Sequence, residues 1–280
     1  MIKLLASDVD GTIVYNDNKI SPKNIEAIEK LNKTDVIFTI CTGKTYLLMK
    51  ELCKKINATY GIFGNGTQII NLKIGKEVER NTLKKEEIEK CIDVANKNNL
   101  HIHIYTDNKI VVQGNLKYIA YRNYVLYKDS VNFQIVEDLE QYIEENEPNV
   151  LKLIISGESD LTKIKQELKK ASNLTVTRIG KYNEYKDKTI DKEYEYLDIE
   201  PNNIRKYNSL KRLCDYLKIS RNEVMAIGDN INDIDMIENA AVGVAIGESN
   251  EEVIKKASYV TKKSAKDGGF AEAINKFIKI

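Results

Sequence analysis

Two aspartates separated by one residue stand where the first apolar segment of the chain ends. Asp8 lies near the end of the segment 2–9, and Asp10 follows that segment directly, before Gly11 and Thr12. Side chains two positions apart on an extended segment point the same way, so both carboxylates can face one small site. Their mutual repulsion favours either a divalent cation or a division into one ionised and one protonated acid. By itself, the pattern is also typical of an exposed acidic turn.

A second acidic loop follows another apolar segment near the other end of the chain. Residues 224–227 lead into Gly228, and Asp229 and Asp233 are four positions apart with Asn232 between them. Both carboxylates can line one pocket if the loop curls into a helix. Neither acidic motif has the ligand spacing of an EF-hand, which excludes that type of calcium site.

Hydrogen-bond donors that could bind an anion are also expected at the end of another strand. Thr42 and Gly43 follow an apolar segment and open a helix, where backbone amides favour negative charge. A Walker A motif is excluded because it would need Gly where Phe38 stands. Lys206 begins a later helix. Each of these residues alone would be an ordinary helix cap or surface charge.

Together the motifs predict phosphoryl transfer. Four acids could hold one hard cation such as Mg²⁺, namely Asp8, Asp10, Asp229 and Asp233. The cation, Lys206, the Thr42 hydroxyl and the Gly43 amide would offset charge on phosphoryl oxygens. A carboxylate can attack phosphorus because the resulting acyl phosphate is itself readily hydrolysed.

The elements that must position these residues alternate between apolar strands and helical patterns. Strands are expected at 2–9, 36–41, 60–63, 196–199, 224–227, 242–246 and 259–260, with helices between them. This alternation predicts a doubly wound parallel sheet, whose ligands bind at the carboxyl ends of its strands.

The middle of the chain has a different rhythm. The segments 101–105 and 109–113 flank a polar turn and predict a hairpin, which is an antiparallel feature. We therefore expect an α/β core at 1–82 and 196–280 and an inserted α+β cap domain at 83–195.

Composition limits the partners. Forty-three Lys and Arg against forty-two Asp and Glu give a formal charge of +1, which favours neither nucleic acid nor a membrane as partner. The four cysteines are far apart and predict neither a zinc site nor a disulfide framework. The first apolar segment is too short for a signal peptide or membrane span, so we expect a cytoplasmic protein. We expect a monomer or a weak homo-oligomer.

With these motifs in this order, the chain resembles the haloacid dehalogenase superfamily, specifically its Cof-type branch (class IIB, C2 cap). The resemblance implies a Rossmann-like core, with Asp8 as nucleophile and Asp10 as general acid and then base. It also implies a Mg²⁺ ion bound by the Asp8 carboxylate, the Asp10 main-chain carbonyl and Asp229, with Asp233 in the outer shell. Thr42 and Lys206 would hold the phosphoryl group, with Asn232 orienting the site.

The expected function is a Mg²⁺-dependent phosphatase for a small phosphorylated metabolite, either a sugar phosphate or a phosphorylated cofactor. A phosphomutase of the same superfamily and a catalytically silent metal-binding module stay open as alternatives. A metal-dependent nucleotide-sugar transferase would also use paired aspartates, but it gives no reason for Thr42 or Lys206.

Four further residues bear on specificity. Similar proteins usually have Arg where Lys44 stands and Gly where Tyr207 stands, so these two departures concern the substrate. His101 and His103 are expected on one face of a cap strand. Two histidines without a third ligand are more often structural, but we hypothesise that they contact substrate.

Overall fold

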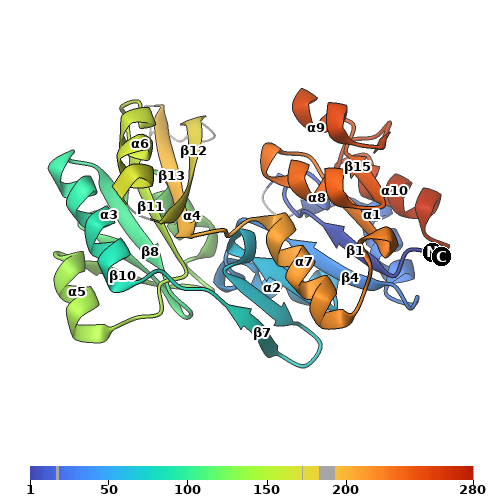
Figure 1. The fold of residues 1–280 in the computed structure, drawn as a ribbon, viewed down its shortest axis with the longest axis horizontal. Coiled ribbons are helices and arrows are strands. Elements are labelled where there is room, and N and C mark those ends of the chain that lie inside the picture. Colours follow the sequence, from blue (N-terminus) through green and yellow to red (C-terminus); the bar gives the residue numbers. More distant parts are fainter. Residues whose placement is uncertain (17–18, 172, 183–192, 280) are drawn as a thin grey trace. The chain divides into compact units, whose positions relative to one another are not determined.

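The computed structural model describes residues 1–16, 19–171, 173–182 and 193–279. The chain divides into two compact units, and each is described by itself (Figure 1). Residues 1–80 and 205–280 form the first unit, and residues 81–204 form the second. Among the described residues, no helix has both the length and the apolar character needed to cross a membrane.

An eight-stranded sheet forms the centre of the first unit, in the order β16-β15-β14-β1-β4-β5-β6-β7. Six strands run parallel: β1 (Leu4–Ser7), β4 (Ile37–Cys41), β5 (Tyr60–Phe63), β14 (Val224–Gly228), β15 (Val242–Ala245) and β16 (Tyr259–Val260). Two antiparallel strands extend the sheet: β6 (Gln68–Asn71) and β7 (Lys76–Arg80). The short strands β2 (Val14–Tyr15) and β3 (Lys19–Ile20) form a separate hairpin. The predicted doubly wound α/β core is therefore confirmed, whereas the hairpin β6–β7 was not anticipated.

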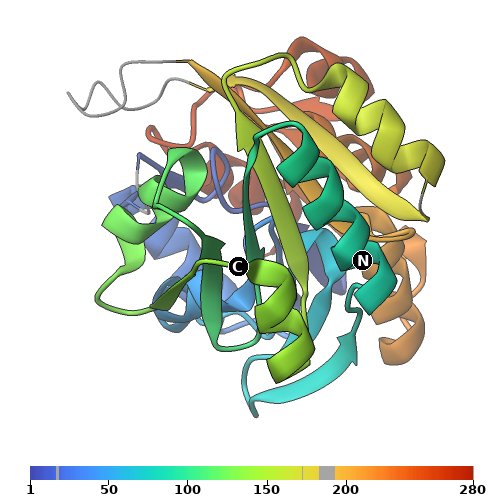
Figure 2. The same ribbon diagram turned by 90° about the vertical axis from the view of Figure 1, so that its left-hand side faces the viewer.

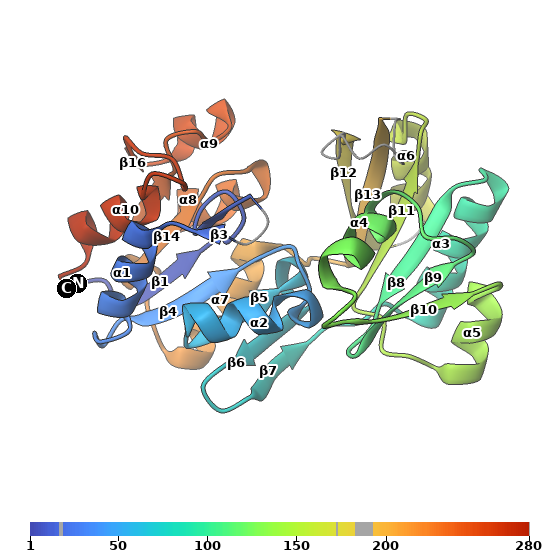
Figure 3. The ribbon, with the colours of Figure 1, turned by 180° about the vertical axis from the view of Figure 1, so that it is seen from behind.

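Helices cover both faces of this sheet. One face packs against α1 (Pro22–Leu31), α2 (Tyr46–Ile56) and α10 (Gly269–Phe277), seen in Figure 3. The opposite face packs against α7 (Lys206–Leu217) and α8 (Ile234–Asn239), and α9 (Glu251–Lys256) packs beside α8. Ser21 caps α1 by accepting from the Asn24 amide, and Pro22 occupies its first turn.

The second unit is built on a six-stranded sheet in the order β10-β9-β8-β11-β13-β12. Its strands are β8 (His101–Tyr105), β9 (Lys109–Gln113), β10 (Asn132–Val136), β11 (Lys152–Gly157), β12 (Leu174–Tyr182) and β13 (Tyr194–Pro201). The predicted hairpin at β8 and β9 is confirmed. Helices α3 (Lys85–Lys97), α5 (Leu139–Asn146) and α6 (Thr162–Ala171) cover one face of the sheet (Figure 2). Helix α4 (Tyr118–Tyr127) lies against the other face, where the Asn123 amide donates to the Tyr105 hydroxyl.

The strand expected at 196–199 in the core sheet belongs instead to the second unit. These residues lie within β13, which pairs antiparallel with β11 and β12. The physical reason is alternation: Leu197 and Ile199 pack into the apolar core of the second unit, while Asp198 points to the other face. A strand buried on both faces of a parallel sheet would be apolar at every position. The core therefore resumes only near residue 205.

Candidate active site

The loop after β1 lies beside the end of β14. The Asp8 amide donates to the Ile227 carbonyl over 2.8 Å, and the Thr12 hydroxyl donates to Asp229 Oδ1 over 2.8 Å. Gly11 makes this approach possible because it has φ +79°, and a Cβ there would lie 2.3 Å from Asp229 Oδ2. The first acidic motif is thus folded directly onto the second.

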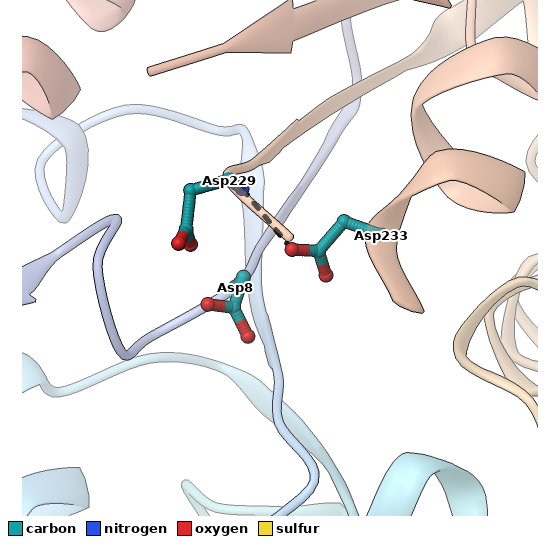
Figure 4. Close-up of side chains that lie close together, drawn as sticks. All are labelled: Asp8, Asp229 and Asp233. Atoms are coloured by element: carbon teal, nitrogen blue, oxygen red, sulfur yellow. Dashed lines mark hydrogen bonds between the residues drawn. The ribbon is translucent and has the colours of Figure 1, made fainter. Parts of the chain in front are cut away.

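Three aspartates form a compact acidic cluster at these strand ends (Figure 4). One carboxylate oxygen from each of Asp8, Asp229 and Asp233 lies within 4.8 Å of the others. Asp233 is fully buried, and its Oδ2 accepts hydrogen bonds from the Asp229 and Asn230 amides over 3.1 and 3.0 Å. These two bonds fix the loop that leads from β14 into α8.

Lys206 supplies the buried positive charge of this cluster. It is the first residue of α7 and is 2% exposed. Its Nζ donates to Asp8 Oδ1 over 2.5 Å and to Asp233 Oδ1 over 2.7 Å. The lysine therefore joins the start of α7 to the ends of β1 and β14.

Burial dominates the electrostatics of the acidic cluster. It raises the pKa of Asp8 well above its ordinary value, although the Lys206 charge opposes the shift. Burial and the neighbouring Asp233 charge raise the pKa of Asp229 to about 6. Burial opposes the charged form of Lys206, but the charges of Asp233 and Asp8 outweigh it and raise the pKa of the lysine. The fold thus concentrates three acids around one ammonium group.

The donor set fits a hard divalent cation. Three carboxylates against one lysine leave excess negative charge, and the burial that raises the pKa of Asp8 and Asp229 opposes their ionised forms, which a bound cation would favour. Carboxylate oxygens are the ligands that Mg²⁺ prefers. Since both Asp233 oxygens already accept hydrogen bonds, Asp8 and Asp229 are the side chains better placed to bind a metal.

Asp10 is placed differently from the other predicted acids. Its carboxylate is half-exposed, lies outside the acidic cluster, and accepts a hydrogen bond from Lys44 Nζ over 2.7 Å. The acidic cluster therefore contains three of the four predicted aspartates. Lys44, interpreted from sequence as a residue that bears on substrate, contacts this acid.

The loop after β4 brings Thr42 and Gly43 to the same edge of the sheet. Thr42 is 1% exposed, and its hydroxyl accepts a hydrogen bond from the Lys44 amide. Asn65, which belongs to none of the predicted motifs, links this loop to the second acidic loop. Its amide donates to the Thr42 carbonyl, and its Oδ1 accepts from Asn232 Nδ2 over 3.3 Å. The sequence feature that could have identified Asn65 is its place between two glycines. Asn in such a turn favours a positive φ, and Asn65 has a φ of 54°.

The other predicted specificity residues have structural contacts. The rings of His101 and His103 lie on one face of β8, 5.8 Å apart, as the alternation predicted. His101 Nε2 lies 2.8 Å from the Asn115 carbonyl, and His103 Nε2 lies 3.2 Å from the Tyr105 hydroxyl. Among the described residues, neither histidine belongs to a group that could hold a metal. Tyr207 packs against the apolar core beneath α7.

Comparison with known proteins shows matches along the whole chain. The family described as haloacid dehalogenase-like hydrolase matches residues 5–274. A 5-amino-6-(5-phospho-D-ribitylamino)uracil phosphatase of Bacillus subtilis is 27% identical over 99% of this chain and 96% of its own length. The crystal structure of a haloacid dehalogenase-like hydrolase from Bacteroides thetaiotaomicron is 26% identical, with a TM-score of 0.83, covering 99% of this chain and all of that one. A subclass IIB sugar phosphatase structure shares the fold, with 22% identity and a TM-score of 0.76 over 98% of each chain.

Proposed function

Because this chain belongs to the haloacid dehalogenase-like hydrolases, as its motifs predicted, we propose that it is a phosphatase that works through an aspartyl-phosphate intermediate. The observation that carries the proposal is the Lys206 ammonium group, which donates to both Asp8 and Asp233 beside Asp229. This arrangement supports the proposal because it combines a carboxylate nucleophile with a cationic group that can offset charge on a phosphoryl group.

Asp8 attacks the phosphorus atom through a carboxylate oxygen, and the ester oxygen leaves. Asp10 donates a proton to that oxygen and later removes a proton from the water that hydrolyses the acyl phosphate. Lys206 is oriented by Asp233 and offsets charge on the phosphoryl oxygens. Thr42 and the Gly43 amide supply hydrogen bonds to the same group.

A bound Mg²⁺ would withdraw charge from the phosphoryl oxygens and reduce repulsion between the substrate and the acids. The residues proposed to hold it are Asp8 and Asp229, with the Asp10 main-chain carbonyl. Asp233 supports them indirectly, because its Oδ2 accepts the amide hydrogens of Asp229 and Asn230. Asn232 helps to orient this loop through Asn65.

The proposed substrate is a small phosphorylated metabolite, either a sugar phosphate or a phosphorylated cofactor. Support comes from the Bacillus subtilis relative, whose name gives a phosphate ester of a ribityl chain, and from the sugar phosphatase that shares the fold. The proposal places the enzyme in the cytoplasm, as a monomer or weak homo-oligomer. Neither nucleic acid nor a membrane is required.

The test compares wild type with Asp8→Asn, using 4-nitrophenyl phosphate and a panel of sugar phosphates in Mg²⁺ buffer. Wild type should release inorganic phosphate. Asp8→Asn should lose at least about 10³-fold in kcat, because it lacks the nucleophile. Acid-quenched wild type should carry phosphate on the peptide that contains Asp8, detected by mass spectrometry.

Asp235→Asn is the matched control, since Asp235 lies on α8 and pairs with Arg205 at 3.5 Å, outside the acidic cluster. This variant should retain activity, and circular dichroism should show all three proteins folded. Equal turnover by wild type and Asp8→Asn would refute the nucleophile. Retention of the phosphate label in the organic product would indicate a phosphomutase instead, and a folded wild type without activity on any ester would favour the silent metal-binding module.

A further inference from the structure

The ion pair between Lys44 and Asp10 has a direct consequence for catalysis. Lys44 Nζ lies 2.7 Å from Asp10 Oδ1, and the two side chains are 22% and 49% exposed. Lys44 also follows the Thr42–Gly43 loop, where its amide donates to the Thr42 hydroxyl. One residue therefore contacts both the acidic loop after β1 and the polar loop after β4.

This pair contributes little to the stability of the fold. Ion pairs as exposed as this one contribute about 0–1 kcal/mol, because water and salt screen the attraction. Other groups hold the two loops in place: the Asp8 amide and the Thr12 hydroxyl in the first loop, and the Thr42 carbonyl, which accepts from the Asn65 backbone amide, in the second. Replacing Lys44 should therefore leave the protein folded, which makes its effect on the reaction measurable.

We propose that Lys44 is a positioning residue that holds the Asp10 carboxyl group for proton donation to the leaving oxygen. This inference rests on the proposed phosphatase function. When Asp8 forms its bond to phosphorus, the bond from phosphorus to the ester oxygen breaks and its electron pair stays on that oxygen. The oxygen takes the Asp10 proton, and Asp10 becomes a carboxylate. The Lys44 ammonium group then lies beside the negative charge created in that step.

The inference predicts a dependence on the leaving group. An alkyl alkoxide is a poor leaving group and requires the proton, whereas 4-nitrophenolate is stable enough to leave without one. The ratio kcat/KM contains only the steps up to the first irreversible release, which is loss of the alcohol or phenol. Hydrolysis of the acyl phosphate, where Asp10 acts again, does not enter this ratio.

The experiment measures kcat/KM for wild type, Lys44→Met and Lys44→Arg. The substrates are 4-nitrophenyl phosphate and the best alkyl phosphate from a panel of sugar phosphates. In Lys44→Met, kcat/KM for the alkyl ester divided by that for the aryl ester should fall about 10- to 100-fold, which is part of the factor expected of a positioned acid. Lys44→Arg should restore most of the ratio because it keeps a cation. Lys54→Met is the matched control, since Lys54 forms an ion pair of the same 2.7 Å length with Glu51 on α2.

Two results would overturn the inference while leaving the phosphatase in place. Equal losses with both esters in Lys44→Met would mean that Lys44 acts on the phosphoryl group itself. Unchanged kcat/KM values for both esters would mean that Asp10 needs no help from Lys44. Failure of wild type to hydrolyse either ester would instead refute the proposed function, and this inference with it.

Discussion

Among the described residues, each unit contains a buried ionic cluster, and the two clusters are built in different ways. The acidic cluster of the first unit, Asp8, Asp229, Asp233 and Lys206, comes from strand ends and the segments that follow them. A second set, here called the sheet-face cluster, lies on one face of three neighbouring strands of the second unit and consists of His103, Tyr105, Lys152, Asp198 and Glu200. Strand register alone brings its members together.

The charges of the two clusters also differ. In the sheet-face cluster Lys152 Nζ lies 2.7 Å from Asp198 and 3.9 Å from Glu200, while burial lowers the pKa of His103 and keeps the imidazole neutral. In the acidic cluster burial raises the pKa of Asp8 and Asp229, so a bound cation would favour their ionised forms. Burial of ionic groups is common to both clusters. What distinguishes the proposed active site is excess negative charge at strand ends, where loops give access to a ligand.

The largest expected contrast comes from removing the lysine of each cluster. Lys206→Met and Lys152→Met each leave buried carboxylates without their cation, so each should destabilise the protein by about 3 kcal/mol. Only Lys206→Met should also lower kcat for 4-nitrophenyl phosphate, by about 10²- to 10³-fold, because it removes a charge that acts on the phosphoryl group. Urea unfolding and initial rates, measured below the unfolding transition, provide the two readouts.

Lys152→Met serves as the matched control for the loss of a buried lysine. If both variants lost activity in proportion to stability, Lys206 would have only a structural role. If Lys206→Met kept full activity, the assignment of this lysine to the phosphoryl group would be wrong.

A smaller contrast is expected when Mg²⁺ is added without substrate. The ion should stabilise wild type by about 2.7 kcal/mol at a hundred times its dissociation constant, because it binds the folded acidic cluster. Thermal unfolding with Mg²⁺ and with EDTA measures the shift. Asp229→Asn should abolish the shift, whereas Asp198→Asn, in the sheet-face cluster, should keep it. A shift that survives Asp229→Asn would place the metal elsewhere.

The two clusters also show how far the sequence could be interpreted. Asp8 and Asp229 follow apolar runs, and the ends of parallel strands meet at one edge of a sheet, so their proximity could be predicted. The sheet-face cluster could not, because Lys152 and Asp198 lie far apart in the chain and meet only through the pairing of β11 with β13. That pairing was missed when residues 196–199 were assigned to the core sheet.

Contacts made by loops were harder still to predict. The pair between Lys44 and Asp10 depends on the path of two loops, which apolar patterns do not define. Asn65 likewise reaches Asn232 only because the turn after β5 takes a positive φ.

The smallest expected contrast concerns pH. Burial lowers the pKa of His103 well below its ordinary value, and electrostatic repulsion from His101 and Lys152 adds to this shift. The unfolded chain therefore binds a proton that the folded protein does not, and this group costs stability as the pH falls below about 6.5. The cost is about 1.4 kcal/mol for each pH unit until the folded pKa is reached.

The His103→Gln variant cannot titrate at this position and should lose less stability than wild type between pH 7 and pH 5, measured by urea unfolding in EDTA. His101→Gln is the control and should give a smaller difference, because the His101 side chain is partly exposed. Identical pH profiles for wild type and His103→Gln would show that the folded protein does not favour the neutral form of His103.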